Sequence, residues 1–308
     1  METGSIIRFV RDQKKRLPKQ FKQGWLIRPE RARTIDDDFL DFLEHERQKL
    51  AHHLINDNIE ISDEAELNEA VQKIIDRILF LKICEDRDID THMSLEKIHK
   101  KWHQGGRVKG EYWRILISVF NYMSRIFNGG LYGHPKEAVH FTDNLYVNDQ
   151  WLDEFVGYLV DDETPYLFAN WSLEVLGSVY ERFLGSQVHL DGSVTQKDEV
   201  RKSGGVVYTP AHIEYEIVDD TVGAMLDQWS RKKIKNMKIV DPACGSGTFL
   251  ITSLDRLCRH WTRVYNDHRE LVDGKSAYVD LNGEVHITTH KKREIVKKNI
   301  FGVDIDAR

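Results

Sequence analysis

The sequence predicts an α + α/β protein, in which a helical N-terminal domain precedes the beginning of a parallel sheet with helices. Three observations lead to this fold class. Residues 1 to about 200 carry apolar side chains at helical spacing; residues 185–205 are polar and contain glycine and serine; after them come short strands, a glycine-rich turn and helices. We therefore expect a helical domain at residues 1–190, a linker at 191–205 and a second domain at 206–308.

Three helices are expected in the first domain, because their apolar residues fall on one face. One begins after Asp63, whose side chain forms a capping box with Glu66, and its apolar stripe runs to Ile83. The others cover residues 111–127, where an Asn-Gly-Gly sequence stops the helix, and 172–184. Such stripes are typical of a helix-bundle core rather than of a cofactor site.

The second domain is expected to alternate strands with helices. Residues 237–241 predict a short buried strand, which a glycine loop joins to a helix beginning at Thr248. Asn282-Gly283 lies between alternating runs and predicts a hairpin at 277–287. A basic helix at 292–298 and a strand at 300–304 follow. Strand, helix and strand with a glycine-rich first turn are typical of the opening of a Rossmann-like sheet.

Composition excludes several classes of protein. The 308 residues are 41% hydrophobic and 31% charged, and no run approaches the ~18 apolar residues of a membrane span. The three cysteines cannot make a disulfide scaffold, and the first residues lack the apolar stretch of a signal peptide. We expect a cytoplasmic protein without a membrane partner. The net charge of −6 differs from that of a compact nucleic-acid module, which is usually basic.

The string Asp-Pro-Ala-Cys-Gly-Ser-Gly-Thr-Phe-Leu at residues 241–250 carries the chemistry. Gly245 and Gly247 allow a sharp turn and close approach of the backbone to a ligand, and the following helix offers free N–H groups. A phosphate-binding P-loop needs Gly-Lys-Ser/Thr, but Thr248 follows Gly247. A dinucleotide fingerprint needs a third Gly or Ala, where Leu250 stands. The whole string fits the S-adenosylmethionine site of methyltransferases.

The string resembles motif I of adenine-specific (amino) DNA methyltransferases. Val-Tyr-Thr-Pro at 207–210 is similar to motif X of this family, and Phe-Gly-Val-Asp-Ile-Asp at 301–306 is similar to motif II, in the order of the classes whose cofactor half comes first. Residues 72–87 and 176–184 resemble the helical region that precedes the methyltransferase domain of type IIG restriction–modification enzymes. Type I modification subunits are a more distant resemblance.

The resemblance implies S-adenosylmethionine as cofactor and a role for each matched residue. Asp304 would accept hydrogen bonds from the ribose hydroxyls, because one carboxylate can take both. The other residues would lie over the cofactor (Tyr208, Thr209 and Pro210) or shape the methionine side of its pocket (Asp241, Ala243, Gly245 and Gly247). Cys244 is expected to be a packing residue of the loop.

One departure concerns the spacing of the two acids. Asp304 follows Asp241 by 63 positions, whereas the acid follows the glycine loop by about 20 residues in dinucleotide sites. The expected hairpin at 277–287 and the basic helix look like an insertion that absorbs the difference. The assignment of Asp304 therefore depends on the hairpin.

The catalytic motif of the resembled family, Asn-Pro-Pro-Tyr, is absent, since none of the six prolines are adjacent. We therefore name no catalytic residue. The Glu-x-Lys element of a metal-dependent nuclease is also absent, and the 14 histidines show no clear zinc spacing, so no metal site is expected. We expect the chain to be the N-terminal part of such an enzyme, inactive alone. It would meet double-stranded DNA mostly through parts outside this sequence, and a partner chain would complete it.

Two other functions stay open. The chain could be a non-catalytic helical interaction subunit with a vestigial cofactor loop, which a stable complex with a partner would reveal. A methyltransferase of RNA or protein would satisfy the glycine loop alone, but the helical half favours the DNA group by resemblance. The expected function is therefore methyl transfer to adenine in DNA, within a restriction–modification or phage-defence system.

Overall fold

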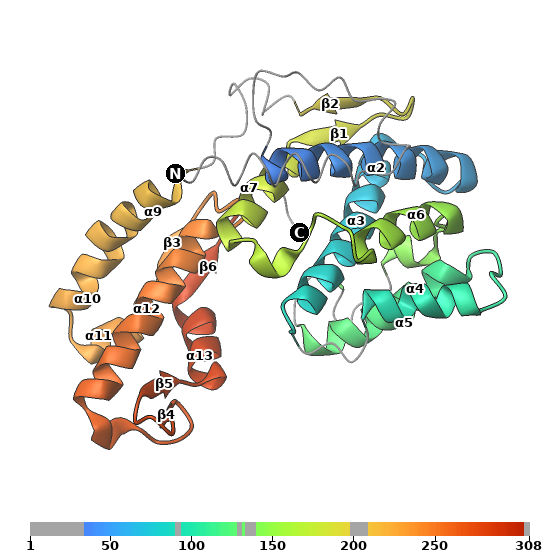
Figure 1. Ribbon diagram of the computed structural model, residues 1–308. Coiled ribbons are helices and arrows are strands. Elements are labelled where there is room, and N and C mark those ends of the chain that lie inside the picture. The colour runs from blue at the N-terminus through green and yellow to red at the C-terminus, as the bar shows by residue number, and fades with distance from the viewer. Residues whose placement is uncertain (1–33, 90–93, 128–130, 133–139, 198–208, 305–308) are drawn as a thin grey trace, which may run out of the picture. The chain divides into compact units, whose positions relative to one another are not determined.

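The computed structural model describes residues 34–89, 94–127, 131–132, 140–197 and 209–304 (Figure 1). The chain divides into two compact units. The first comprises residues 1–171 and 182–203, and the second comprises residues 172–181 and 204–308. The predicted domain limits of 190 and 206 stay predictions, and residues 172–181, expected in the helical domain, fall in the second unit.

The described part of the first unit is mainly helical. The Asp63 side chain caps α3 by accepting the Glu66 N–H at 2.8 Å, which confirms the predicted start of this helix. A small antiparallel pair joins β1 and β2. The elements are α2 (Ile35–Asp57), α3 (Glu64–Asp86), α4 (Leu95–Gln104), α5 (Glu111–Ile126), η2 (Phe141–Asn144), α6 (Asp149–Val160), η3 (Phe168–Asn170), β1 (Ser186–Val188) and β2 (Val194–Gln196).

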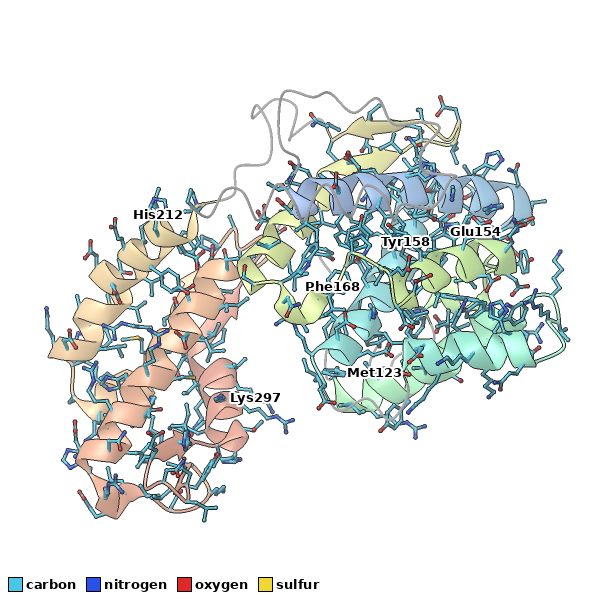
Figure 2. All side chains as sticks on the ribbon, in the orientation of Figure 1. Met123, Glu154, Tyr158, Phe168, His212 and Lys297 are labelled. Carbon is cyan, nitrogen blue, oxygen red and sulfur yellow. The ribbon has the colours of Figure 1, made fainter. Side chains whose placement is uncertain are left out.

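An aromatic cluster lies at the centre of this unit. The ring of Phe39 lies 4.7 Å from that of Tyr166 and 5.3 Å from those of Phe168 and Trp171, measured between centroids. All four side chains are buried, and Phe168, labelled in Figure 2, is fully so. The apolar stripes of α3 and α5 are buried as well, as expected for a bundle core. Among the described helices, none has the length and apolar character that a membrane crossing requires.

Arg77 explains why a charged residue interrupts the apolar run of α3. Its guanidinium is buried, donates to the Leu131 carbonyl at 2.9 Å and pairs with the Asp143 carboxylate at 2.5 Å. A buried charge is tolerated when it is paired and hydrogen-bonded in this way. Arg77 therefore ties α3 to the segment around η2.

The second unit combines helices with short strands. Its helices bury one apolar face in a common core, in which Leu257 and Ala277 are fully buried. The hairpin predicted at 277–287 is present, with Ala277 opposite Ile287. The elements are α7 (Leu173–Leu184, shared with the first unit), α9 (Ala211–Val218), η4 (Asp219–Gly223), α10 (Ala224–Gln228), α11 (Arg231–Lys235), β3 (Ile239–Asp241), α12 (Thr248–Asp267), η5 (Arg269–Leu271), β4 (Ala277–Val279), β5 (Val285–Ile287), α13 (Thr289–Asn299) and β6 (Ile300–Gly302).

Strands β3 and β6 are parallel, with Ile239 opposite Ile300 and Val240 opposite Phe301. Helix α12 packs against both strands (Figure 1). Val240 and Phe301 stay exposed, at 58% and 38%. The strand–helix–strand order is as predicted, but the pair alone does not establish a full Rossmann-like sheet.

Candidate cofactor-binding site

The glycine loop joins the end of β3 to the start of α12. Gly245 has a φ of +51° and Gly247 a φ of +80°, a region that side chains other than glycine rarely adopt. The Gly247 N–H donates to the Cys244 carbonyl at 2.7 Å and closes the turn. The two glycines singled out in the sequence are thus the two loop residues with a positive φ.

Helix α12 begins directly behind the loop. Its N-cap residue is Gly247, which has no side chain to cap the first turn. The first N–H groups of a helix have no partner within the helix, and the N-terminus of a helix as long as α12 favours negative charge. This end of α12 can therefore receive a carboxylate.

The parallel pairing of β3 and β6 brings the two predicted acids to one edge. Asp304 Oδ2 accepts the N–H of Gly245 at 2.8 Å. The Cys244 N–H donates to the Val303 carbonyl at 3.0 Å, and the Val303 N–H donates to the Asp241 carbonyl at 2.9 Å. The spacing of 63 positions between Asp241 and Asp304 therefore does not separate Asp304 from the loop, because the hairpin and α13 take up the extra length.

Close approach of β6 to the loop depends on Gly302. A Cβ atom there would lie 2.8 Å from Leu250 Cδ1 and 2.9 Å from Cys244 Sγ. Carbon atoms in contact are about 3.5–4.0 Å apart. Glycine at this position therefore lets β6 carry Asp304 up to Gly245.

Glu181 is a site residue that the sequence analysis missed. It lies on α7, and its Oε1 accepts the Ser246 N–H at 3.0 Å and the Ser246 hydroxyl at 2.5 Å. The apolar spacing of residues 172–184 predicts only a helix of the first domain. The sequence shows an acidic residue next to Tyr180 on a helix with an apolar face. It does not indicate that the partner of this acid is Ser246, which lies 65 residues later in the chain.

The other predicted residues are placed as follows. The Ala243 N–H donates to Asp241 Oδ1 at 3.1 Å, so Asp241 also shapes the start of the loop. Pro210 is the N-cap of α9, and among the described contacts none joins Thr209 or Pro210 to the loop. Tyr208 lies outside the described residues.

Cys244 lies within the loop, next to both acids. Partial burial, followed by the charges of Asp304 and Asp241, raises the pKa of the Cys244 thiol above its usual value. The neutral thiol is a poor nucleophile. This agrees with the expectation that Cys244 is a packing residue.

The described residues also contain a group that could hold a metal, although none was expected: His99, His103 and Asp153. Arg107 lies 2.5 Å from Nδ1 of His103 and can only donate, so neutral His103 carries its proton on Nε2. That Nε2 faces Asp153 Oδ1 at 2.8 Å. The His103 atom that a metal would need therefore already faces the Asp153 carboxylate.

A second group comprises Asp280, Glu284 and His286 in the hairpin. Asp280 accepts the N–H groups of Asn282 and Glu284, at 2.9 and 2.8 Å, and His286 lies 3.0 Å from its other oxygen. These bonds stabilise the turn.

One family of known proteins matches a segment of the chain that contains the glycine loop, β3, β6 and α7. Residues 172–307 match the N-6 DNA Methylase family. The match begins at the same residue as the second unit, which supports assigning the start of α7 to the methylase segment. The resemblance to adenine-specific DNA methyltransferases is thereby confirmed.

Two relatives extend this comparison. A protein of Escherichia coli described as the type II restriction enzyme and methyltransferase RM.Eco57I is 30% identical over 281 residues, or 89% of this chain. The methylase subunit of the type I restriction enzyme MjaIX, from Methanocaldococcus jannaschii, is 37% identical over 128 residues, or 41% of this chain. The matches span 26% and 19% of the relatives' own lengths. No solved structure gives a significant match.

Proposed function

We propose that this chain provides the S-adenosylmethionine-binding part of an adenine-specific DNA methyltransferase in a restriction–modification system. The observation that carries the proposal is the meeting of the glycine loop with Asp304, through the Gly245 N–H at 2.8 Å. The match of residues 172–307 to N-6 DNA methylases and the two relatives support the enzyme class.

The residues present fit the cofactor, which when bound supplies an electrophilic methyl group on sulfur. Asp304 can keep its bond to Gly245 and still accept ribose hydroxyls, because a carboxylate has about four acceptor positions. The uncapped first turn of α12 would hold the methionine carboxylate. The positive φ of Gly245 and Gly247 lets the backbone come close to the ligand.

Methyl transfer itself is assigned to residues outside this sequence. Transfer to an exocyclic amine needs groups that accept the amino hydrogens and a ring that stacks on the flipped base. The Asn-Pro-Pro-Tyr motif that supplies both does not occur in the 308 residues. We therefore propose that the chain alone does not methylate DNA, and that contact with double-stranded DNA and completion of the enzyme involve further protein. We assign it to the cytoplasm, where its DNA would be found.

Calorimetric titration with S-adenosylhomocysteine tests the cofactor site. Asp304→Ala should weaken binding by roughly a hundredfold or more, because two hydrogen bonds to a charged group are lost. Gly245→Val should abolish binding, because a branched side chain is strained at a φ of +51° and fills the approach. Asp267→Ala, an exposed acid at the end of α12, should leave affinity unchanged.

Equal affinity of Asp304→Ala and wild type would refute the ribose assignment. A wild-type chain that binds no cofactor and forms a stable complex with a partner would favour the non-catalytic interaction subunit. Incorporation of labelled methyl groups into DNA by the 308-residue chain would refute the proposal that catalysis lies elsewhere.

A further inference from the structure

Two successive backbone amides of the glycine loop each donate to a carboxylate. The Gly245 N–H donates to Asp304, and the Ser246 N–H donates to Glu181. The two acids come from opposite sides in the sequence, 59 residues after the loop and 65 residues before it. The loop is thus held between Glu181 on α7 and Asp304, which follows β6, and both residues belong to the second unit.

We propose that Glu181 is a positioning residue of the cofactor site. It fixes Ser246 and thereby shapes the loop for the methionine part of S-adenosylmethionine. This inference rests on the proposed function and deepens it. Glu181 would act through Ser246 and Gly245 rather than through the reacting atoms.

The packing around Glu181 is close on both sides. A Cβ atom on Gly177, one turn earlier on α7, would lie 3.2 Å from Ser246 Oγ and 3.4 Å from Thr248 Cγ2. A Cβ atom on Gly245 would lie 2.8 Å from Glu181 Oε1. The absence of side chains at both glycines therefore lets α7 approach the loop closely enough for the bonds of Glu181 to form.

The bonds of Glu181 also decide what the loop can bind. Successive backbone N–H groups in such turns form concavities that attract anions such as phosphate. Here the amides of Gly245 and Ser246 already donate to carboxylates. A ligand carboxylate is therefore directed to the first turn of α12, because these two amides already have acceptors.

The first experiment needs no ligand. Hydrogen–deuterium exchange of the peptide at 241–250 is compared in wild type, Glu181→Ala and Glu181→Gln. Exchange should be fastest in Glu181→Ala, because Ser246 loses its acceptor, and intermediate in Glu181→Gln, whose amide oxygen still accepts. The control is Glu216→Ala on α9, an exposed acid of the same unit, which should behave as wild type.

The second experiment separates positioning from a general structural role. S-adenosylhomocysteine and methylthioadenosine share the adenosine part, but only the first carries the amino-acid part. Glu181→Ala should weaken binding of S-adenosylhomocysteine about tenfold, the scale of losing hydrogen bonds to a charged group. It should leave the affinity for methylthioadenosine within about twofold.

The outcomes are distinguishable. Unchanged exchange in Glu181→Ala overturns the positioning role, whether or not the chain binds cofactor. Equal losses for both ligands overturn it too, because they indicate general damage to the fold. A wild-type chain that binds neither ligand refutes the proposed function and the cofactor half of this inference, while exchange still decides whether Glu181 holds Ser246.

Discussion

Replacing Gly302 by alanine tests how the end of β6 meets the glycine loop. The new Cβ atom would lie 2.8 Å from Leu250 Cδ1 and 2.9 Å from Cys244 Sγ, so neighbours must move by roughly 0.7 Å to reach ordinary contact. Overpacking costs about 1–3 kcal/mol, and the lower end of this range applies here because both close atoms are ends of side chains that can move. We expect Gly302→Ala to lower the free energy of unfolding of the second unit by that amount.

Urea denaturation combined with hydrogen exchange of α12 peptides measures this loss in the second unit alone. In the background of Leu250→Ala, which removes one of the two close atoms, the cost of Gly302→Ala should fall. Asp267→Ala, at an exposed position of the same unit, is the control and should leave this free energy unchanged. A change below about 0.5 kcal/mol for Gly302→Ala, the range of ordinary surface substitutions, would refute the close approach.

Two further predictions concern charge. The rate of Cys244 alkylation by iodoacetamide, followed by peptide mass spectrometry, should titrate with an apparent pKa above the ordinary value of 9.0. Asp304→Ala should lower that pKa, because one of the nearby negative charges is removed. Identical pH profiles of alkylation in the variant and the wild type would contradict this argument. Hydrogen bonding to Lys298, and then to Lys291, lowers the pKa of Glu294 from 4.5 to about 2, so its contribution to stability is complete above pH 4.5 and is lost as the pH falls toward 2. Glu294→Gln should therefore lower the free energy of unfolding in urea by about 0.5–1 kcal/mol at pH 7, because solvent partly screens the ion pairs, and by less at pH 3. A loss that does not depend on pH would exclude the ion pairs as its cause.

Local signals made much of the fold predictable. Asp63 and Glu66 act within one helical turn, and Asn282-Gly283 acts within one hairpin, so the residues that determine these structures are neighbours in the sequence. The loop glycines were predictable for the same reason, because Gly245 and Gly247 occupy backbone conformations that few other residues adopt.

Contacts between distant segments were not predictable in this way. Glu181 shares a helix with apolar residues, and helical spacing does not reveal that its carboxylate meets Ser246. The same holds for Arg77, whose partners, the Leu131 carbonyl and Asp143, are 54 and 66 residues away. In both cases the packing of segments decides the contact, and one sequence alone carries no record of that packing.

The pairing of β3 with β6 also has a consequence for the order of folding. Ile239 and Ile300 lie opposite each other, so this parallel pair forms only after a long stretch of chain closes on itself, and the entropic cost of closing a loop grows with its length. Helix α12 and the β4–β5 hairpin depend on local contacts and should form first. Pulse-labelled hydrogen exchange should therefore show the amides of α12 protected early and those of β3 and β6 late, which means that the glycine loop acquires its shape only in the final stage of folding.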